Sequence, residues 1–155
     1  MTSVDLTITS RFAGGDSVKN QVSARYSLRD IGYNDEKGSP SETFREARLT
    51  YKIPITEGEP PVAESFTLKL DREGNPLEAR LHRPGAGMRL DFICGQSSRT
   101  RLDTPAGALE ITVRTDRLEG SCKGAHVQIK LQYELTLGTD AQGRTVIEYS
   151  GDICS

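Results

Sequence analysis

Residues 126–137, HVQIKLQYELTL, decide the fold class. Apolar side chains occupy every second position of this stretch, and polar side chains fill the positions between them. The apolar members are Val127, Ile129, Leu131, Tyr133, Leu135 and Leu137. Successive side chains point to opposite faces of a β-strand, whereas apolar positions on a helix recur every three or four residues. The stretch therefore predicts a strand with one buried face.

The same alternation recurs along the whole chain. It predicts about ten strands, near residues 4–12, 22–28, 47–53, 66–70, 77–81, 88–92, 102–104, 108–116, 126–137 and 147–149. Turn-forming residues separate them, as in the Asp71–Pro76 loop and in Thr104-Pro105-Ala106-Gly107. One segment is ambiguous, because Ser39-Pro40-Ser41-Glu42 resembles a helix capping box. A short helical turn over 40–47 competes there with a third strand that begins near Glu46.

Strands joined in sequence by short turns form a meander. One face of each strand is apolar and the other is charged, so an open sheet of this length would leave unpaired edges. Closure into a barrel removes those edges. The sequence predicts an all-β fold, a single antiparallel meander β-barrel of about eight to ten strands that forms one domain over residues 1–155. A barrel of that size is filled by side chains or holds one small ligand.

The C-terminal half carries a family resemblance, through motifs that follow one another in order. They are Leu81-His82-Arg83-Pro84-Gly85, Met88–Phe92, Thr104–Ile111, Thr115–Leu118 and Val127–Leu137. With these motifs the chain resembles the YwiB-like family of small bacterial β-barrels. The resemblance implies a lipocalin-like (calycin) fold, no established activity and no catalytic residues. Two departures stand out: Ala106 occupies a turn position that is usually aromatic, and the polar stretch 30–45 is longer than usual.

Composition narrows the functional classes. The formal charge of −2 gives no overall attraction to nucleic acid or to an anionic membrane. The chain has neither an apolar stretch long enough to span a bilayer nor the apolar run of a signal peptide. Three cysteines without paired spacing are typical of a reducing compartment. We therefore expect a cytoplasmic protein without a nucleic-acid or membrane partner.

Catalytic and metal-binding residues are scarce. His82 and His126 are the two histidines, and both fall on the polar faces of their strands. No nucleophile, phosphate-binding or dinucleotide motif occurs, and no cysteine or histidine pair has chelating spacing. We expect no cofactor, no metal and no catalytic site, and an enzyme is the least favoured class. Cys94 is expected in the core, and Cys122 in an exposed loop where Lys123 lowers its thiol pKa.

Arginines crowd the middle of the chain, from Arg80 to Arg117, but acidic residues alternate with them. Such alternation on outward faces is typical of cross-strand ion pairs on a solvated wall. A nucleic-acid groove would need a surplus of positive charge and exposed aromatic side chains. The pattern therefore favours a solvated outer wall.

The inward faces carry several aromatic side chains and no charged residue at a clear inward position. The candidate cavity-lining residues are Tyr26, Tyr51, Phe66, Met88, Phe92, Tyr133 and Tyr149. The hydroxyl groups of the four tyrosines either find partners within a filled barrel or orient a ligand in a cavity. The first hypothesis is non-catalytic binding of a small, mostly apolar molecule in the interior. The alternative is a filled barrel that acts as a protein-interaction or self-associating module, such as a homodimer.

Overall fold

A computed structural model describes residues 2–12, 15–34, 40–54, 57–123 and 126–154. The described residues form ten β-strands and one short 3-10 turn. In chain order these are β1 Thr2–Phe12, β2 Ser17–Asn34, β3 Pro40–Ile53, β4 Val62–Leu70, β5 Pro76–Arg83, η1 Pro84–Ala86, β6 Met88–Ile93, β7 Ser97–Thr104, β8 Gly107–Lys123, β9 His126–Leu137 and β10 Asp140–Cys154. The predicted all-β class and meander are confirmed.

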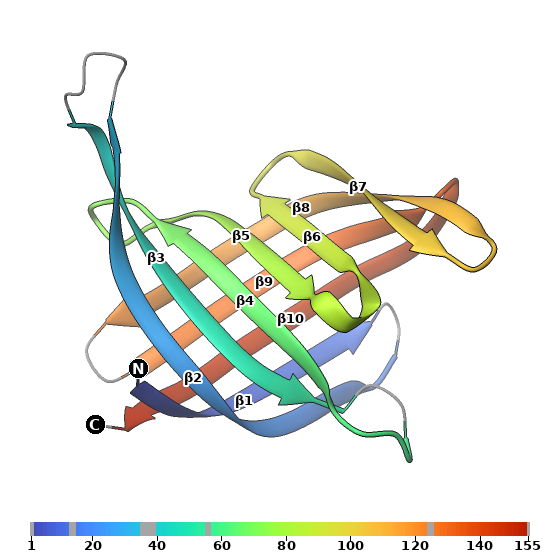
Figure 1. The fold of residues 1–155 in the computed structure, drawn as a ribbon, viewed down its shortest axis with the longest axis horizontal. Helices are drawn as coiled ribbons and strands as arrows, with labels where there is room; N and C mark the ends of the chain where they lie inside the picture. The colour runs from blue at the N-terminus through green and yellow to red at the C-terminus, as the bar shows by residue number, and fades with distance from the viewer. Residues whose placement is uncertain (1, 13–14, 35–39, 55–56, 124–125, 155) are drawn as a thin grey trace.

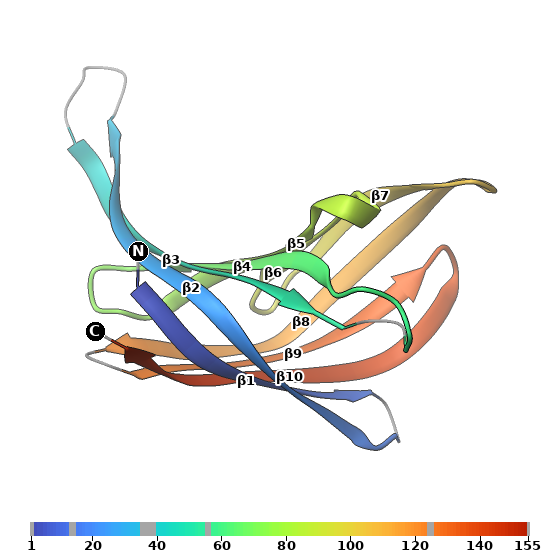
Figure 2. The same cartoon turned by 60° about the horizontal axis from the view of Figure 1, so that its bottom comes forward.

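The strands form one antiparallel sheet in the order β6-β5-β4-β3-β2-β1-β10-β9-β8-β7. Consecutive strands are neighbours except for β6 and β7, which lie at the two ends of this order, and β10 returns to pair with β1 from Ser3↔Cys154 to Phe12↔Thr145. The sheet curves into a flattened, nearly closed barrel with two walls (Figures 1 and 2). We call β2–β6 the front wall, and β1 with β8–β10 the back wall.

The barrel closes at a seam between β6 and β7. The turn after β6 bonds to β8, because Gly95 N donates to Thr115 O at 2.9 Å and Thr115 N donates to Gln96 O at 3.1 Å. Ser98 Oγ donates to the carbonyl oxygen of Asp91 at 2.6 Å. These bonds satisfy backbone groups that an open sheet edge would expose.

The centre of the barrel is filled by side chains from both walls. The rings of Phe66 and Tyr149 have centroids 4.7 Å apart, and those of Phe92 and Tyr133 are 4.9 Å apart. A Cβ atom added to Gly120 on β8 would lie 3.2 Å from Leu68 Cδ2 on β4. The opposite walls therefore touch at mid-barrel, where burial of the apolar side chains stabilises the fold.

Two local expectations are wrong. The described residues from Pro40 onward form strand rather than a helical turn, because β3 pairs with β2 and the backbone bonds to that partner. Cys94 is exposed rather than buried, since β6 ends at Ile93 and the chain turns there. At Pro40 strand pairing overrides the local capping pattern, and at Cys94 the turn ends the alternation of β6.

A bulge in β8 explains a third difference between prediction and structure, the position of Cys122. The pairing of β8 with β9 shifts between Thr115 and Arg117, so the face that points inward changes there. As a result Leu118 and Cys122 pack against the core, and Cys122 lies in a strand rather than in an exposed loop.

Both histidines are exposed, as the alternation predicts. Among the described residues, no helix has the length and apolarity needed to cross a membrane.

Candidate functional site

A buried ion pair lies at one end of the barrel interior. Glu64 on β4 has a relative exposure of only 6%, and the Arg83 side chain on β5 keeps 22%. Arg83 Nη2 and Nε donate to Glu64 Oε1 at 2.6 and 3.2 Å. The expectation that no charge points inward is therefore wrong. Two opposite charges satisfy each other here, which offsets the cost of removing them from water.

Two tyrosine hydroxyls complete the environment of the carboxylate. Tyr51 on β3 donates its hydroxyl to Glu64 Oε2 at 2.6 Å, and its oxygen lies 3.2 Å from the hydroxyl of Tyr149 on β10. Because Tyr51 donates to the carboxylate, the proton shared by the two hydroxyls comes from Tyr149. Burial raises the pKa of Tyr51 and of Tyr149 far above the usual range. Both hydroxyls therefore keep their protons at physiological pH.

The back wall contributes a second group of polar atoms. The hydroxyl of Tyr133 bonds to Thr145, and burial raises the pKa of Tyr133 to about 12. Thr115, which pairs with Tyr133 in register, is 1% exposed. Its Oγ1 has no hydrogen-bond partner among the described residues. A buried hydroxyl without a partner is uncommon in folded proteins.

We name this set of residues the Glu64 cluster; it comprises Tyr51, Glu64, Arg83, Thr115, Tyr133, Thr145 and Tyr149. An apolar rim lies beside it, on the hairpin that joins β1 to β2. Phe12 pairs with Thr145 in register and is 56% exposed, and Val18 is 50% exposed. Alternation along β1 and β2 places both side chains on the same face as the core residues Ile8 and Val22. The inner face of the sheet is therefore uncovered at this end.

The predicted cavity-lining residues fall into three groups. Tyr51, Tyr133 and Tyr149 belong to the Glu64 cluster. Phe66 and Phe92 are buried against Tyr149 and Tyr133, and Met88 is partly buried beside Arg83, its register partner. Tyr26 bonds instead to Cys122, away from this cluster. All seven side chains lie on the inner face, and their role in lining a ligand site stays a prediction.

Cys122 differs from expectation in its chemistry as well. Burial raises the pKa of its thiol, so the thiolate is less populated than in an ordinary surface cysteine. His126 Nδ1 lies 2.9 Å from Asp152 Oδ1 at the exposed surface. Within the described part of the chain, no three His, Cys, Asp or Glu side chains are grouped so that they could hold a metal ion.

The sequence contains the signal for the buried ion pair. Glu64 lies two residues before the inward Phe66, and Arg83 lies two residues after the inward Leu81. Extending the strict alternation would have placed both charges inside. Their meeting could not be read from the sequence, because it depends on the register in which Ser65 pairs with His82.

The comparisons with known proteins agree with this fold. The chain resembles the crystal structure of the YwiB protein from Bacillus subtilis, with a TM-score of 0.62 at 12% sequence identity over 99% of this chain and 92% of that one. At that identity the likeness shows the fold alone. No curated protein matches the chain. Residues 42–148 match the family model described as "Domain of unknown function (DUF1934)". This chain therefore belongs to the DUF1934 family of YwiB-like proteins, whose function is unknown.

Proposed function

We propose that the protein binds a small molecule without catalysis, at the end of the barrel where the Glu64 cluster meets the apolar rim. The observation that carries this proposal is the Glu64–Arg83 pair, because Glu64 is the one charged residue among the buried residues that the structure describes. A buried ion pair contributes little net stability, and apolar residues of similar volume often stabilise a fold as well or better. Such groups are found more often where a protein binds or reacts with something.

The ligand is a molecule with an apolar body and a hydrogen-bonding head. Phe12 and Val18 offer apolar surface on the uncovered inner face. The partly exposed guanidinium of Arg83 offers hydrogen-bond donors to the head. The ion pair is neutral as a whole, so the head carries no net charge. Because the centre of the barrel is packed, the site lies at this end rather than deep inside.

Native mass spectrometry of the protein purified from its own host tests this proposal. We expect a fraction of the protein to carry a bound small molecule, which solvent extraction then identifies. The double variant Phe12→Ser/Val18→Ser removes the rim and is expected to lose most of that fraction. Leu77→Ser is the matched control, because Leu77 is also exposed, at 37%, and lies at the opposite end of β5 from Arg83.

Two outcomes would contradict the proposal. One is a wild-type protein that carries no bound small molecule in any preparation. The other is equal retention of the molecule by the wild type and by the rim variant. Either outcome would favour the filled barrel that acts only through its outer surface.

A further inference from the structure

The outer face of the front wall carries a basic surface that the linear sequence does not reveal. Strand pairing aligns outward side chains into rows across β2 to β6, and two adjacent rows have an excess of arginine. The first row is Arg25–Thr50–Ser65–His82–Arg89, and the second is Ser27–Arg48–Thr67–Arg80–Asp91. Together the rows contain four arginines and one aspartate, in a chain whose net charge is −2. We call this surface the basic wall.

The arginines of the basic wall are accessible. All four are exposed. Arg80 and Arg89 share the single carboxylate of Asp91, with Nε–Oδ distances of 2.8 and 3.4 Å. Arg25 and Arg48 form no ion pair with any other residue in the described ranges. The basic wall therefore has more cationic groups than its own carboxylates neutralise.

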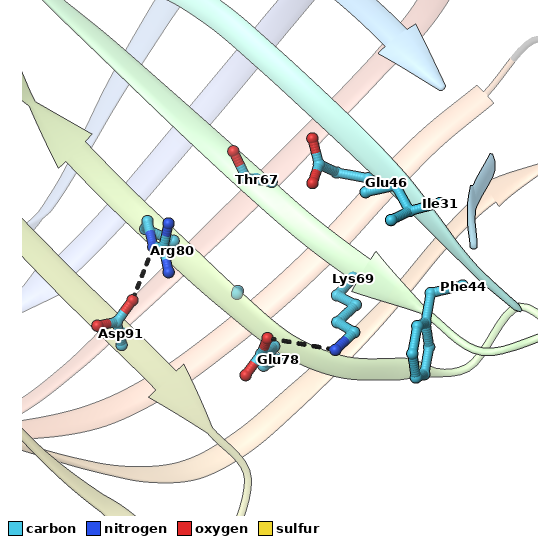
Figure 3. A pocket seen from close by; sticks show the side chains of 9 residues that line it. Ile31, Phe44, Glu46, Thr67, Lys69, Glu78, Arg80 and Asp91 are labelled. Carbon is cyan, nitrogen blue, oxygen red and sulfur yellow. Dashed lines mark hydrogen bonds and ion pairs between the residues drawn. The ribbon is translucent and has the colours of Figure 1, made fainter. Parts of the chain in front are cut away.

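A hollow adjoins the second row and has an apolar side. It measures about 180 Å³ and shares Thr67, Arg80 and Asp91 with that row, and the carboxylates of Glu46 and Glu78 also line it. Figure 3 shows Phe44 at one end of the hollow and the Arg80–Asp91 pair at the other. Lys69 Nζ lies 4.0 Å from the centroid of the Phe44 ring and pairs with Glu78 at 3.7 Å. The volume is similar to that of a cavity that holds benzene, about 150 Å³.

A second hollow lies on the same wall, beside the first row. It measures about 340 Å³ and is lined in part by Arg25, Arg48 and Thr50. Neighbouring strands are about 4.8 Å apart, so the four intervals from β2 to β6 span about 19 Å. An extended chain of about six residues covers that distance.

We propose that the basic wall docks an acidic, extended segment of a partner protein, with one apolar side chain of that segment seated in the hollow beside Phe44. Carboxylates of the segment would pair with Arg25 and Arg48, and the hydroxyls of Thr50 and Thr67 would donate to them. Charge complementarity gives the rate and specificity of docking, and the apolar anchor adds affinity.

The chemistry of the surface favours a protein segment over other anions. The two rows contain no aromatic side chain on which a nucleic-acid base could stack. They contain no apolar side chain that could enter a lipid layer. The hollow beside Phe44 offers an apolar contact, and its size suits one side chain. The proposal does not depend on the small-molecule site, which lies on the inner face.

Fluorescence anisotropy of a labelled peptide tests the docking. The probe is a ten-residue peptide of alternating glutamate and aspartate with one central phenylalanine. The double variant Arg25→Gln/Arg48→Gln is expected to weaken its binding at least tenfold. Arg99→Gln/Arg101→Gln on β7 is the matched control, because it removes the same charge from two exposed arginines outside the basic wall. The control is expected to change binding less than twofold.

A second peptide tests the apolar side chain that is proposed to sit in the hollow beside Phe44. In this peptide alanine replaces the central phenylalanine, and we expect it to bind the wild type at least threefold more weakly. Equal weakening by the two arginine variants would overturn the proposal, because it would indicate attraction to overall charge. The absence of saturable binding to the wild type would also overturn it. So would tighter binding to a 12-base-pair RNA duplex or to vesicles of anionic lipid than to the peptide.

Discussion

The front and back walls are built from the same residue types, but strand register arranges their outward charges differently. On the back wall one row reads Thr9–Glu148–Lys130–Glu119, with one positive charge and two negative charges. On the front wall the two rows of the basic wall hold four arginines against one aspartate. Both walls alternate polar and apolar residues along each strand. The difference therefore arises from pairing across strands rather than from the sequence of any one strand.

The inner faces differ as well. The front wall contributes the charged members of the Glu64 cluster, whereas the back wall contributes neutral hydroxyls from Thr115, Tyr133 and Tyr149. Charge buried inside a protein is costly unless it is paired, and a hydroxyl is cheaper to bury. We therefore expect the walls to respond differently to removal of one polar group.

The largest effect is expected on the front wall. Glu64→Leu leaves the Arg83 guanidinium without its carboxylate and should lower the free energy of unfolding by about 3 kcal/mol. Glu64→Leu/Arg83→Met removes both charges and should cost less than the single variant. Urea denaturation measures both changes. A double variant less stable than Glu64→Leu would contradict this account of the pair.

A smaller effect is expected from the back wall at alkaline pH. The pKa of Tyr133 is about 12 in the folded protein and 10.0 when the group is unperturbed. Between these values the unfolded chain releases a proton that the folded protein keeps, so the free energy of unfolding falls as pH rises. The loss attributable to Tyr133 reaches about 2 kcal/mol at pH 12.

Urea denaturation at pH 9 to 12 checks this, with Tyr133→Phe beside the wild type. The variant should be less stable than the wild type near neutral pH but should lose stability less steeply above pH 10. Parallel pH profiles for the two proteins would show that the Tyr133 hydroxyl is accessible to solvent when folded.

The smallest effects are expected at exposed ion pairs. Asp91→Asn on the front wall leaves Arg80 and Arg89 without their shared carboxylate, and should cost about 0.5–1 kcal/mol. Glu148→Gln on the back wall breaks one exposed pair with Lys130, at 3.4 Å, and should cost about 0.3 kcal/mol. Sodium chloride at high concentration should reduce the difference between the stability losses of the two variants. A larger loss for Glu148→Gln would contradict the comparison of the two walls.

Alternation was sufficient to predict the all-β class, the meander and the inward position of the aromatic side chains. Leu131 and Phe66, for example, are buried as the pattern requires. It failed where a strand departs from strict pairing, as at the β8 bulge that turns Cys122 inward. It also failed for Glu64, because a charged residue was not expected to continue an apolar face. The basic wall was beyond prediction, since it depends on register across five strands.

The pairing of β1 with β10 has a consequence for the order of events in folding. Strands that lie about 140 residues apart in the chain become hydrogen-bonded neighbours, from Ser3↔Cys154 onward. Contacts of such long sequence separation slow folding, because a large loop must close before they form. During synthesis the edge of β1 that pairs with β10 has no partner until β10 has emerged from the ribosome. Its free edge is therefore exposed to pairing with other chains throughout that interval.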